Sequence, residues 1–239
     1  MQKITIIFDN NKDNENLSGG FGFSCLIEFN DKKILFDTGG NRDAFFENIE
    51  KLNIHLEEIT HIVFSHKHLD HLAGLDEVLE RTPNASIFLP DFFPENLLQK
   101  IPQKSNTTLI KSFTEVSKDV YLLPLIGTYN SKEIHEQSLI LNTSQGLVVV
   151  TGCAHPGIVK ILTTTRENFA SKKIYLALGG FHFYKSWFWT SLRAVKQFKK
   201  LDIEKVAPCH CTGNSASTQF QKRYKENFIK AGTGTIINV

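Results

Sequence analysis

Short apolar runs separated by polar turns recur along the chain and predict many strands, while apolar residues at helical spacing predict fewer helices. Strands are expected at residues 4–8, 24–29, 33–36, 59–64, 86–89, 120–125, 138–141, 147–151, 173–178 and 205–208. Helices are expected at residues 43–52, 72–79, 158–165, 189–201 and 215–229. Along the chain, a strand-rich stretch is followed by a stretch in which strand and helix alternate, and this order occurs twice. We expect two sheets covered by outer helices in a single domain over residues 1–239, although periodicity alone leaves several α/β topologies open.

Composition narrows the class of protein. Hydrophobic residues make up 41% and charged residues 22%, which excludes a disordered or collagen-like chain. The formal net charge is only +2, so no nucleic-acid partner is expected. The N-terminus lacks the apolar stretch of a signal peptide, and no apolar run is long enough to span a bilayer. Four cysteines without a CxxC pair support no disulfide framework. We therefore expect a cytoplasmic protein with reduced thiols, a small-molecule substrate and no membrane partner.

Six of the nine histidines fall in four short clusters, each directly after a predicted strand. In the first cluster, His66 and His68 are two residues apart, so they point the same way on extended backbone. Asp70 and His71 follow where the loop turns into a helix. Imidazole and carboxylate suit Zn²⁺ or Fe²⁺, so four such groups within six residues predict a metal site. A polar loop with merely solvated histidines is the alternative.

The other three clusters supply one histidine each. His155 lies in segment 151–157, His182 ends segment 179–182, and His210 lies in segment 208–213. A single histidine after a strand is more often structural. Its repetition after several strands favours a shared site, because strand ends converge on one edge of a sheet.

These residues together resemble a known family. The pattern His66-x-His68-x-Asp70-His71, preceded by Phe-Asp-Thr-Gly at 36–39 and followed by His155 and His210, resembles the metallo-β-lactamase superfamily. Segments 151–157, 179–182 and 208–213 are similar to the branch that includes dihydropterin ribofuranosyl-aminobenzene phosphate synthases. The resemblance covers roughly residues 4–212. It implies an α+β fold, the αββα sandwich, with a metal site at one edge of the sheets.

The resemblance also implies roles for individual residues. Asp37 would lie behind the site and orient a ligand histidine, which agrees with the need of ligand imidazoles for a second acceptor. A turn-forming Asp after a strand is the alternative. The implied ligands of one metal are His66, His68 and His155, and those of the other are Asp70, His71 and His210.

One departure from the family pattern affects the second metal. The superfamily's bridging Asp would lie in the segment ending near Gly180, but no Asp or Glu occurs between Glu167 and Asp202. His182 is the ionisable residue there, and we expect it either to bind metal or to face substrate. We therefore expect one tight Zn²⁺ and a weaker second ion, with Fe²⁺ or Mn²⁺ as alternatives. Cys209 and Cys211 are not expected as ligands, because neighbours of His210 point away from it on extended backbone.

The implied function is a metal-dependent hydrolase or group-transfer enzyme that uses a metal-activated hydroxide. Asp70 would orient the nucleophile, and His182 would stabilise charge on a substrate oxygen. The resemblance suggests a pterin-like or phosphate-ester small molecule as substrate. The alternatives are a nuclease-like phosphodiesterase, which the near-neutral charge disfavours, and a metal- or ligand-binding domain without activity.

Overall fold

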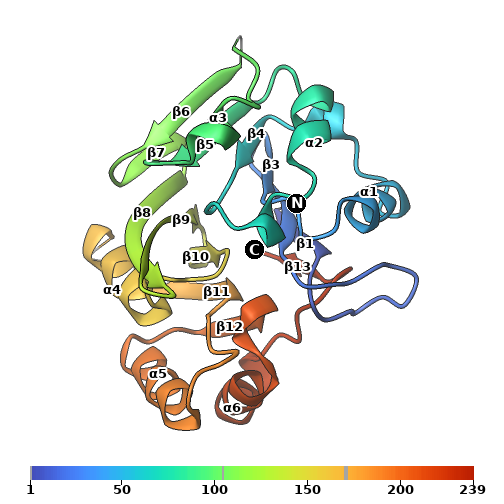
Figure 1. Ribbon diagram of the computed structural model, residues 1–239. Helices are drawn as coiled ribbons and strands as arrows, with labels where there is room; N and C mark the ends of the chain where they lie inside the picture. Colours follow the sequence, from blue (N-terminus) through green and yellow to red (C-terminus); the bar gives the residue numbers. More distant parts are fainter. Residues whose placement is uncertain (1, 104, 170–171) are drawn as a thin grey trace. The chain divides into compact units, whose positions relative to one another are not determined.

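The computed structural model describes residues 2–103, 105–169 and 172–239 (Figure 1). The N-terminal segment, in which no signal peptide is expected, includes Met1, and Met1 lies outside the described residues. The chain divides into two compact units. Unit 1 comprises Met1–Lys111 and Ala231–Val239, and unit 2 comprises Ser112–Lys230.

Unit 1 is built on a seven-stranded sheet in the order β13-β1-β2-β3-β4-β5-β6. Its strands are β1 (Lys3–Phe8), β2 (Ser24–Phe29), β3 (Lys32–Phe36), β4 (His61–Val63), β5 (Ser86–Pro90), β6 (Asn106–Ile110) and β13 (Ile236–Asn238). Strands β3 to β6 run parallel, so their carboxyl ends share one edge. The helices are α1 (Arg42–Lys51), α2 (Leu75–Arg81) and α3 (Glu95–Leu98), with 3-10 turns η1 (Leu56–Glu58) and η2 (Leu69–His71).

Helix α1 shows how the local sequence produces this packing. The Asn41 side chain caps the helix by accepting a hydrogen bond from the Ala44 N–H at 3.0 Å. Phe45 and Ile49, four residues apart, are buried in the same core as Leu35 of the sheet.

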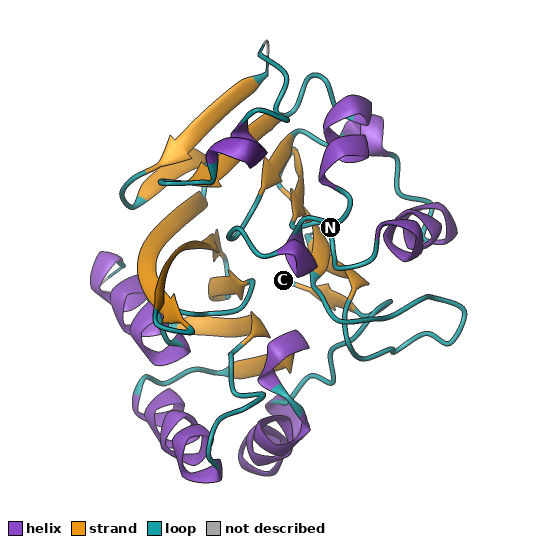
Figure 2. Cartoon of the chain, viewed as in Figure 1, coloured by secondary structure: helices purple, strands orange, loops and turns teal. Residues whose placement is uncertain are grey.

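Unit 2 contains a six-stranded sheet in the order β12-β11-β10-β9-β8-β7. Its strands are β7 (Thr114–Ser117), β8 (Val120–Tyr129), β9 (Lys132–Thr143), β10 (Gly146–Thr151), β11 (Ile174–Gly180) and β12 (Lys205–Cys209). Strands β10, β11 and β12 are parallel neighbours. The helices are α4 (Ile158–Asn168), α5 (Phe188–Lys200) and α6 (Asn214–Tyr224), shown in purple in Figure 2, with 3-10 turns η3 (His210–Thr212) and η4 (Lys225–Asn227). Phe198 of α5 and Phe220 of α6 are fully buried in the core of this unit.

Several elements differ from the sequence predictions. Residues 215–229 were expected to form one helix, but α6 ends at Tyr224 because Lys225 adopts a positive φ of 49°. Strands β6, β7 and β13 and the short helix α3 were not predicted. Four of the five residues of β6 are exposed, so the sequence of this edge strand lacks the alternation of apolar and polar residues that predicts a strand. Among the described residues, no helix is long and apolar enough to cross a membrane.

Candidate metal centre

In unit 1, a buried carboxylate at the end of β3 organises the first histidine cluster. Because β3 and β4 are parallel, the Asp37 N–H reaches the Val63 carbonyl at 2.9 Å, which aligns the two strand ends. The Asp37 carboxylate accepts hydrogen bonds from the Ser65 N–H at 2.7 Å, the Ser65 hydroxyl at 2.6 Å and His71 Nδ1 at 2.7 Å. The structure therefore provides the contact that was expected between Asp37 and a histidine of the motif.

Asp37 and His71 each favour the charged form of the other. Burial raises the pKa of Asp37, although the charge of His71 and its hydrogen bond oppose that rise. Burial lowers the pKa of His71, but the charge and hydrogen bond of Asp37 outweigh burial and raise it to about 10. The hydrogen bond at Nδ1 leaves Nε2 on the opposite side of the ring, 3.5 Å from Asp70 Oδ2.

His66 and His68 lie beside this pair. His66 Nε2 is 3.1 Å from His68 Nδ1, and His66 Nδ1 is 2.8 Å from the Ser65 hydroxyl oxygen. The ring centres of His66 and His71 are 4.2 Å apart. Unit 1 thus brings together all four ligand residues predicted from the first motif.

Gly22 gives the loop that carries Asp70 the space it needs. Its φ of 149° lies in a region that side chains disfavour. A Cβ at this position would lie 2.4 Å from the Gly40 nitrogen and 2.5 Å from the Asp70 carbonyl oxygen. The next residue, Phe23, donates its N–H to that same carbonyl at 3.2 Å. The glycine is therefore a structural requirement for the position of the Asp70 backbone.

In unit 2, the remaining three predicted histidines follow the parallel strands β10, β11 and β12. The ring centres of His155 and His182 are 4.5 Å apart. His210 Nε2 lies 3.3 Å from the sulfur of Cys153. Potential ligand atoms of Cys153, His155 and His182 all lie within 4.8 Å of one another. The convergence of strand ends expected from the sequence is therefore present in this unit.

Sequence reasoning missed the importance of Glu136, which lies on β9 and is 1% exposed. One carboxylate oxygen accepts the N–H groups of Cys153 and Ala154, at 2.9 and 2.7 Å. The other accepts the His155 N–H and its ring Nδ1, both at 2.8 Å. Burial raises the pKa of Glu136, but these hydrogen bonds and the charge of His155 outweigh burial and lower it. Glu136 lies in a polar segment between His135 and Gln137, before the strand predicted at residues 138–141, so no apolar pattern marked it as buried.

The expectation about the cysteines rested on an extended backbone, and that premise is wrong. His210 has a φ of 47° and begins the 3-10 turn η3. The Cys211 thiol consequently points back into the histidine cluster, where its sulfur is 3.5 Å from the Cys153 carbonyl oxygen. Burial raises the pKa of Cys211, but contacts with Cys153, His210 and His182 outweigh burial and lower it well below its ordinary value.

The chemistry of these donors fits a divalent metal ion. His71 and His155 each have Nδ1 bound to a buried carboxylate, which fixes the ring and leaves Nε2 for a ligand bond. Imidazole, carboxylate and thiol groups are the ligands that zinc and related metals prefer in proteins.

Comparison with known proteins agrees with these observations. Residues 17–92 match the family model of the metallo-beta-lactamase superfamily. The chain is 29% identical to a 7,8-dihydropterin-6-methyl-4-(beta-D-ribofuranosyl)-aminobenzene-5'-phosphate synthase of Methanocaldococcus jannaschii, over 90% of this chain and 89% of that protein. It superposes on Tm1679, described as a metal-dependent hydrolase of the beta-lactamase superfamily, with a TM-score of 0.81 and 28% identity, covering 100% of this chain and 99% of that one.

A more distant structure supports the fold alone. The metallo-beta-lactamase fold protein YhfI from Bacillus subtilis has a TM-score of 0.71 at 17% identity, covering 99% of this chain and 98% of that one. The predicted fold class is therefore confirmed.

Proposed function

We propose that the chain is a metal-dependent hydrolase or group-transfer enzyme acting on a small molecule. The proposal is supported by its similarity to the metallo-β-lactamase superfamily in sequence and in fold. The observation that carries this proposal is the pair of buried carboxylate–imidazole contacts, Asp37–His71 and Glu136–His155. A buried carboxylate is costly unless it is fully hydrogen-bonded. Both carboxylates are satisfied by groups that hold a histidine in one orientation, which is the arrangement metal-binding histidines require.

The ligand sets are proposed from the family resemblance together with these contacts. Zn²⁺ is the proposed metal, with one tight site and a weaker second one, and Fe²⁺ or Mn²⁺ are the alternatives. His182 is an additional ligand or a substrate contact. The first proposed ligand set is His66, His68 and His155, and the second is Asp70, His71 and His210.

A divalent metal bound by these residues would supply Lewis-acid activation of water and of the substrate. The chain's own residues then have separate tasks. Asp37 holds the Nδ1 proton of His71, so that this ring cannot rotate away. Asp70 retains 20% side-chain exposure and therefore has access to water, which suits it to orient the nucleophile. His182 would donate a hydrogen bond to the substrate oxygen on which charge develops.

The substrate class is proposed from the relatives. The Methanocaldococcus jannaschii protein is named as a synthase of a dihydropterin phosphate compound, and Tm1679 is described as a metal-dependent hydrolase. We therefore propose a pterin-like molecule or a phosphate ester as the substrate.

Metal analysis of purified protein tests the proposal, with hydrolysis of a panel of esters and phosphodiesters measured in parallel. His66→Ala is expected to lose metal and activity together. The control His55→Ala removes an exposed histidine beside Glu57 and should change neither. Cys211→Ala is expected to retain both, because Cys211 belongs to neither proposed ligand set. Loss of its metal would place Cys211, whose thiol points into the histidine cluster, among the ligands. Full metal content in His66→Ala would overturn the proposed ligands, and bound metal without any turnover would favour a binding domain instead.

A further inference from the structure

The second unit carries an unusual cluster of exposed aromatic residues at the start of α5. The chain has two tryptophans, Trp187 and Trp189, and their exposed fractions are 82% and 64%. Phe188 between them is 51% exposed, and its ring centre lies 5.5 Å from that of Trp189. Tryptophan is normally among the more buried residues, and a contiguous exposed apolar patch usually marks an interaction surface.

Positive charge continues from this aromatic cluster along both helices. Trp189, Arg193, Lys196 and Lys200 are all exposed and follow a spacing of four, three and four residues, which places them on one face of α5. Helices α5 and α6 together contain six basic residues and no acidic one. Residues 168–225 contain 11 of the chain's 27 basic residues but only two of its 25 acidic residues. The near-neutral net charge therefore hides a strongly cationic region.

A groove of about 520 Å³ lies between α5 and α6, which run side by side in Figure 1. Its walls combine apolar residues such as Phe188 and Leu192 with three cations, and no acidic residue lines it. In the part of the chain that the structure describes, none of these cations forms an ion pair with a carboxylate. The three cations are Lys196, Lys222 and Arg223.

A buried polar atom in the same groove also lacks a partner. Gln219 is 8% exposed and lines the groove. Its amide nitrogen donates to the Ser191 hydroxyl at 2.9 Å, whereas its oxygen has no hydrogen-bond partner within the described residues. Such an atom is costly unless an outside donor reaches it. The groove therefore offers cations for an anion and an acceptor for a hydroxyl or amide group.

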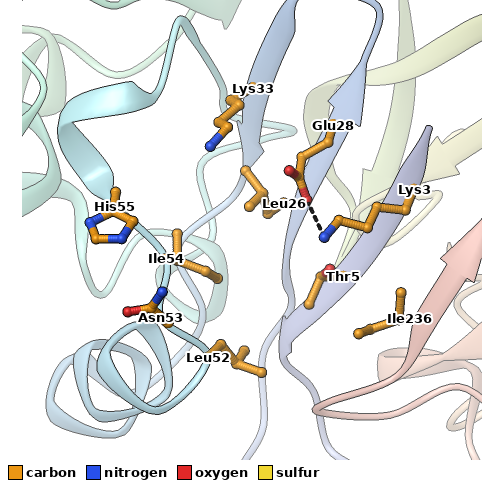
Figure 3. A pocket seen from close by; sticks show the side chains of 10 residues that line it. All are labelled: Lys3, Thr5, Leu26, Glu28, Lys33, Leu52, Asn53, Ile54, His55 and Ile236. Atoms are coloured by element: carbon orange, nitrogen blue, oxygen red, sulfur yellow. Dashed lines mark ion pairs between the residues drawn. The ribbon is translucent and has the colours of Figure 1, made fainter. Parts of the chain in front are cut away.

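A hollow in unit 1 shows how ordinary surface lysines behave (Figure 3). That hollow has a volume of about 140 Å³ and contains Lys3 and Lys33. Lys3 pairs with Glu28 at 2.9 Å, and Lys33 pairs with Glu58. Its lysines are neutralised by acidic neighbours, unlike the cations between α5 and α6.

We propose that the α5–α6 face binds the surface of an anionic lipid membrane, with a phosphate-bearing head group in the groove. Trp and Phe side chains insert favourably at the boundary between head groups and acyl chains, and Lys and Arg are attracted to anionic lipids. The phosphate pairs with Lys222 and Arg223, and a head-group hydroxyl donates to the Gln219 oxygen. This departs from the expectation of no membrane partner, which rested on the lack of an apolar run long enough to span a bilayer.

The two tryptophans are the probe for the test. Full-length protein is titrated with vesicles of phosphatidylglycerol and phosphatidylcholine, and separately with phosphatidylcholine alone. Anionic vesicles should shift tryptophan emission to shorter wavelength and carry the protein in flotation, and added salt should weaken both effects because it screens the charges. No shift and no flotation, or equal binding to neutral vesicles, would overturn the proposal.

Matched variants assign the binding to this face. Lys222→Gln with Arg223→Gln should weaken partitioning about 25-fold, because each basic residue near an anionic leaflet contributes roughly a factor of five. The control Lys51→Gln with Lys100→Gln removes the same charge from lysines already paired with acids, and should change partitioning little. Equal losses in the two pairs would refute a specific site. Circular dichroism and metal content verify that each variant is folded.

Three further experiments test the insertion of the tryptophans and distinguish a lipid from free phosphate and from nucleic acid. Trp187→Ala with Trp189→Ala should abolish flotation, and retention of flotation would contradict the insertion of these side chains. Inorganic phosphate at millimolar concentration should not displace the vesicles, because it lacks the apolar part of a lipid. Tighter binding to a single-stranded oligonucleotide than to anionic vesicles would assign the face to nucleic acid and overturn the proposal.

Discussion

Replacement of Glu136 by glutamine is the sharpest test of how the unit 2 histidines are held. The substitution keeps the shape of the side chain but converts one of its two acceptor oxygens into an NH₂ group. Four N–H groups point at the carboxylate, two at each oxygen, at distances of 2.7 to 2.9 Å. Whichever way the amide is turned, two of these donors face another donor.

The structure sets the size of the effect. A buried donor left without an acceptor costs about 1–3 kcal/mol, so two of them cost about 2–6 kcal/mol of unfolding free energy. Part of that cost is relieved if His155 moves its proton to Nε2 and accepts from the new amide through Nδ1. That tautomer blocks the ring nitrogen available for metal, so metal affinity should fall roughly 10- to 100-fold.

Two measurements separate these effects. Urea unfolding of the metal-free protein gives the stability change, and titration against a competing chelator gives the metal affinity. Glu133→Gln on the same strand is the control, because Glu133 is exposed and its carboxylate contacts His135, which belongs to neither proposed ligand set. It should change stability by less than about 0.5 kcal/mol. An unfolding free energy and metal affinity for Glu136→Gln equal to those of the wild type would refute the reasoning.

Three further predictions concern unit 1. Asp37→Asn should lower metal affinity roughly 10- to 100-fold, because it releases His71. The control Asp31→Asn alters an exposed carboxylate beside Lys32 and should leave metal affinity unchanged. Equal metal affinities of the two variants in a chelator competition would contradict this prediction. Gly22→Ala should destabilise the protein by about 1–3 kcal/mol, because its Cβ meets the Gly40 and Asp70 backbone; an unchanged urea midpoint would show that the loop relaxes freely. In metal-free protein, protonated His71 has a pKa of about 10 against an ordinary 6.5, so its stabilising contribution is complete below pH 6.5 and is lost as the pH rises toward 10. Urea midpoints should fall over that range in the wild type and fall less in Asp37→Asn, and a flat wild-type profile would exclude the ion pair.

The first metal motif could be predicted from the sequence because its chemistry is local. His66, His68, Asp70 and His71 lie within six residues, so no long-range contact is needed to bring them together. The positions of His155, His182 and His210 were also predictable in outline. Each follows a strand, and parallel strands place their carboxyl ends at one edge.

The contacts of Glu136 and the orientation of Cys211 could not be predicted in the same way. Glu136 precedes the strand predicted at residues 138–141. It reaches His155 because β9 begins earlier, at Lys132, and lies next to β10 in the sheet. The orientation of Cys211 depends on the positive φ of His210, which no local pattern indicated.

The sequence by itself indicated the family resemblance, most of the strands and helices, and the residues proposed to bind metal, because periodicity and ligand chemistry are properties of short segments. Tertiary structure alone decided that Glu136 holds His155 and where surface charge accumulates. The cations of α5 and α6 are more than 20 residues apart in the chain and line one groove only because the two helices pack together. The sequence of a helix shows which of its residues share one face. It does not show which distant element packs beside that face, because this depends on the geometry of the whole fold.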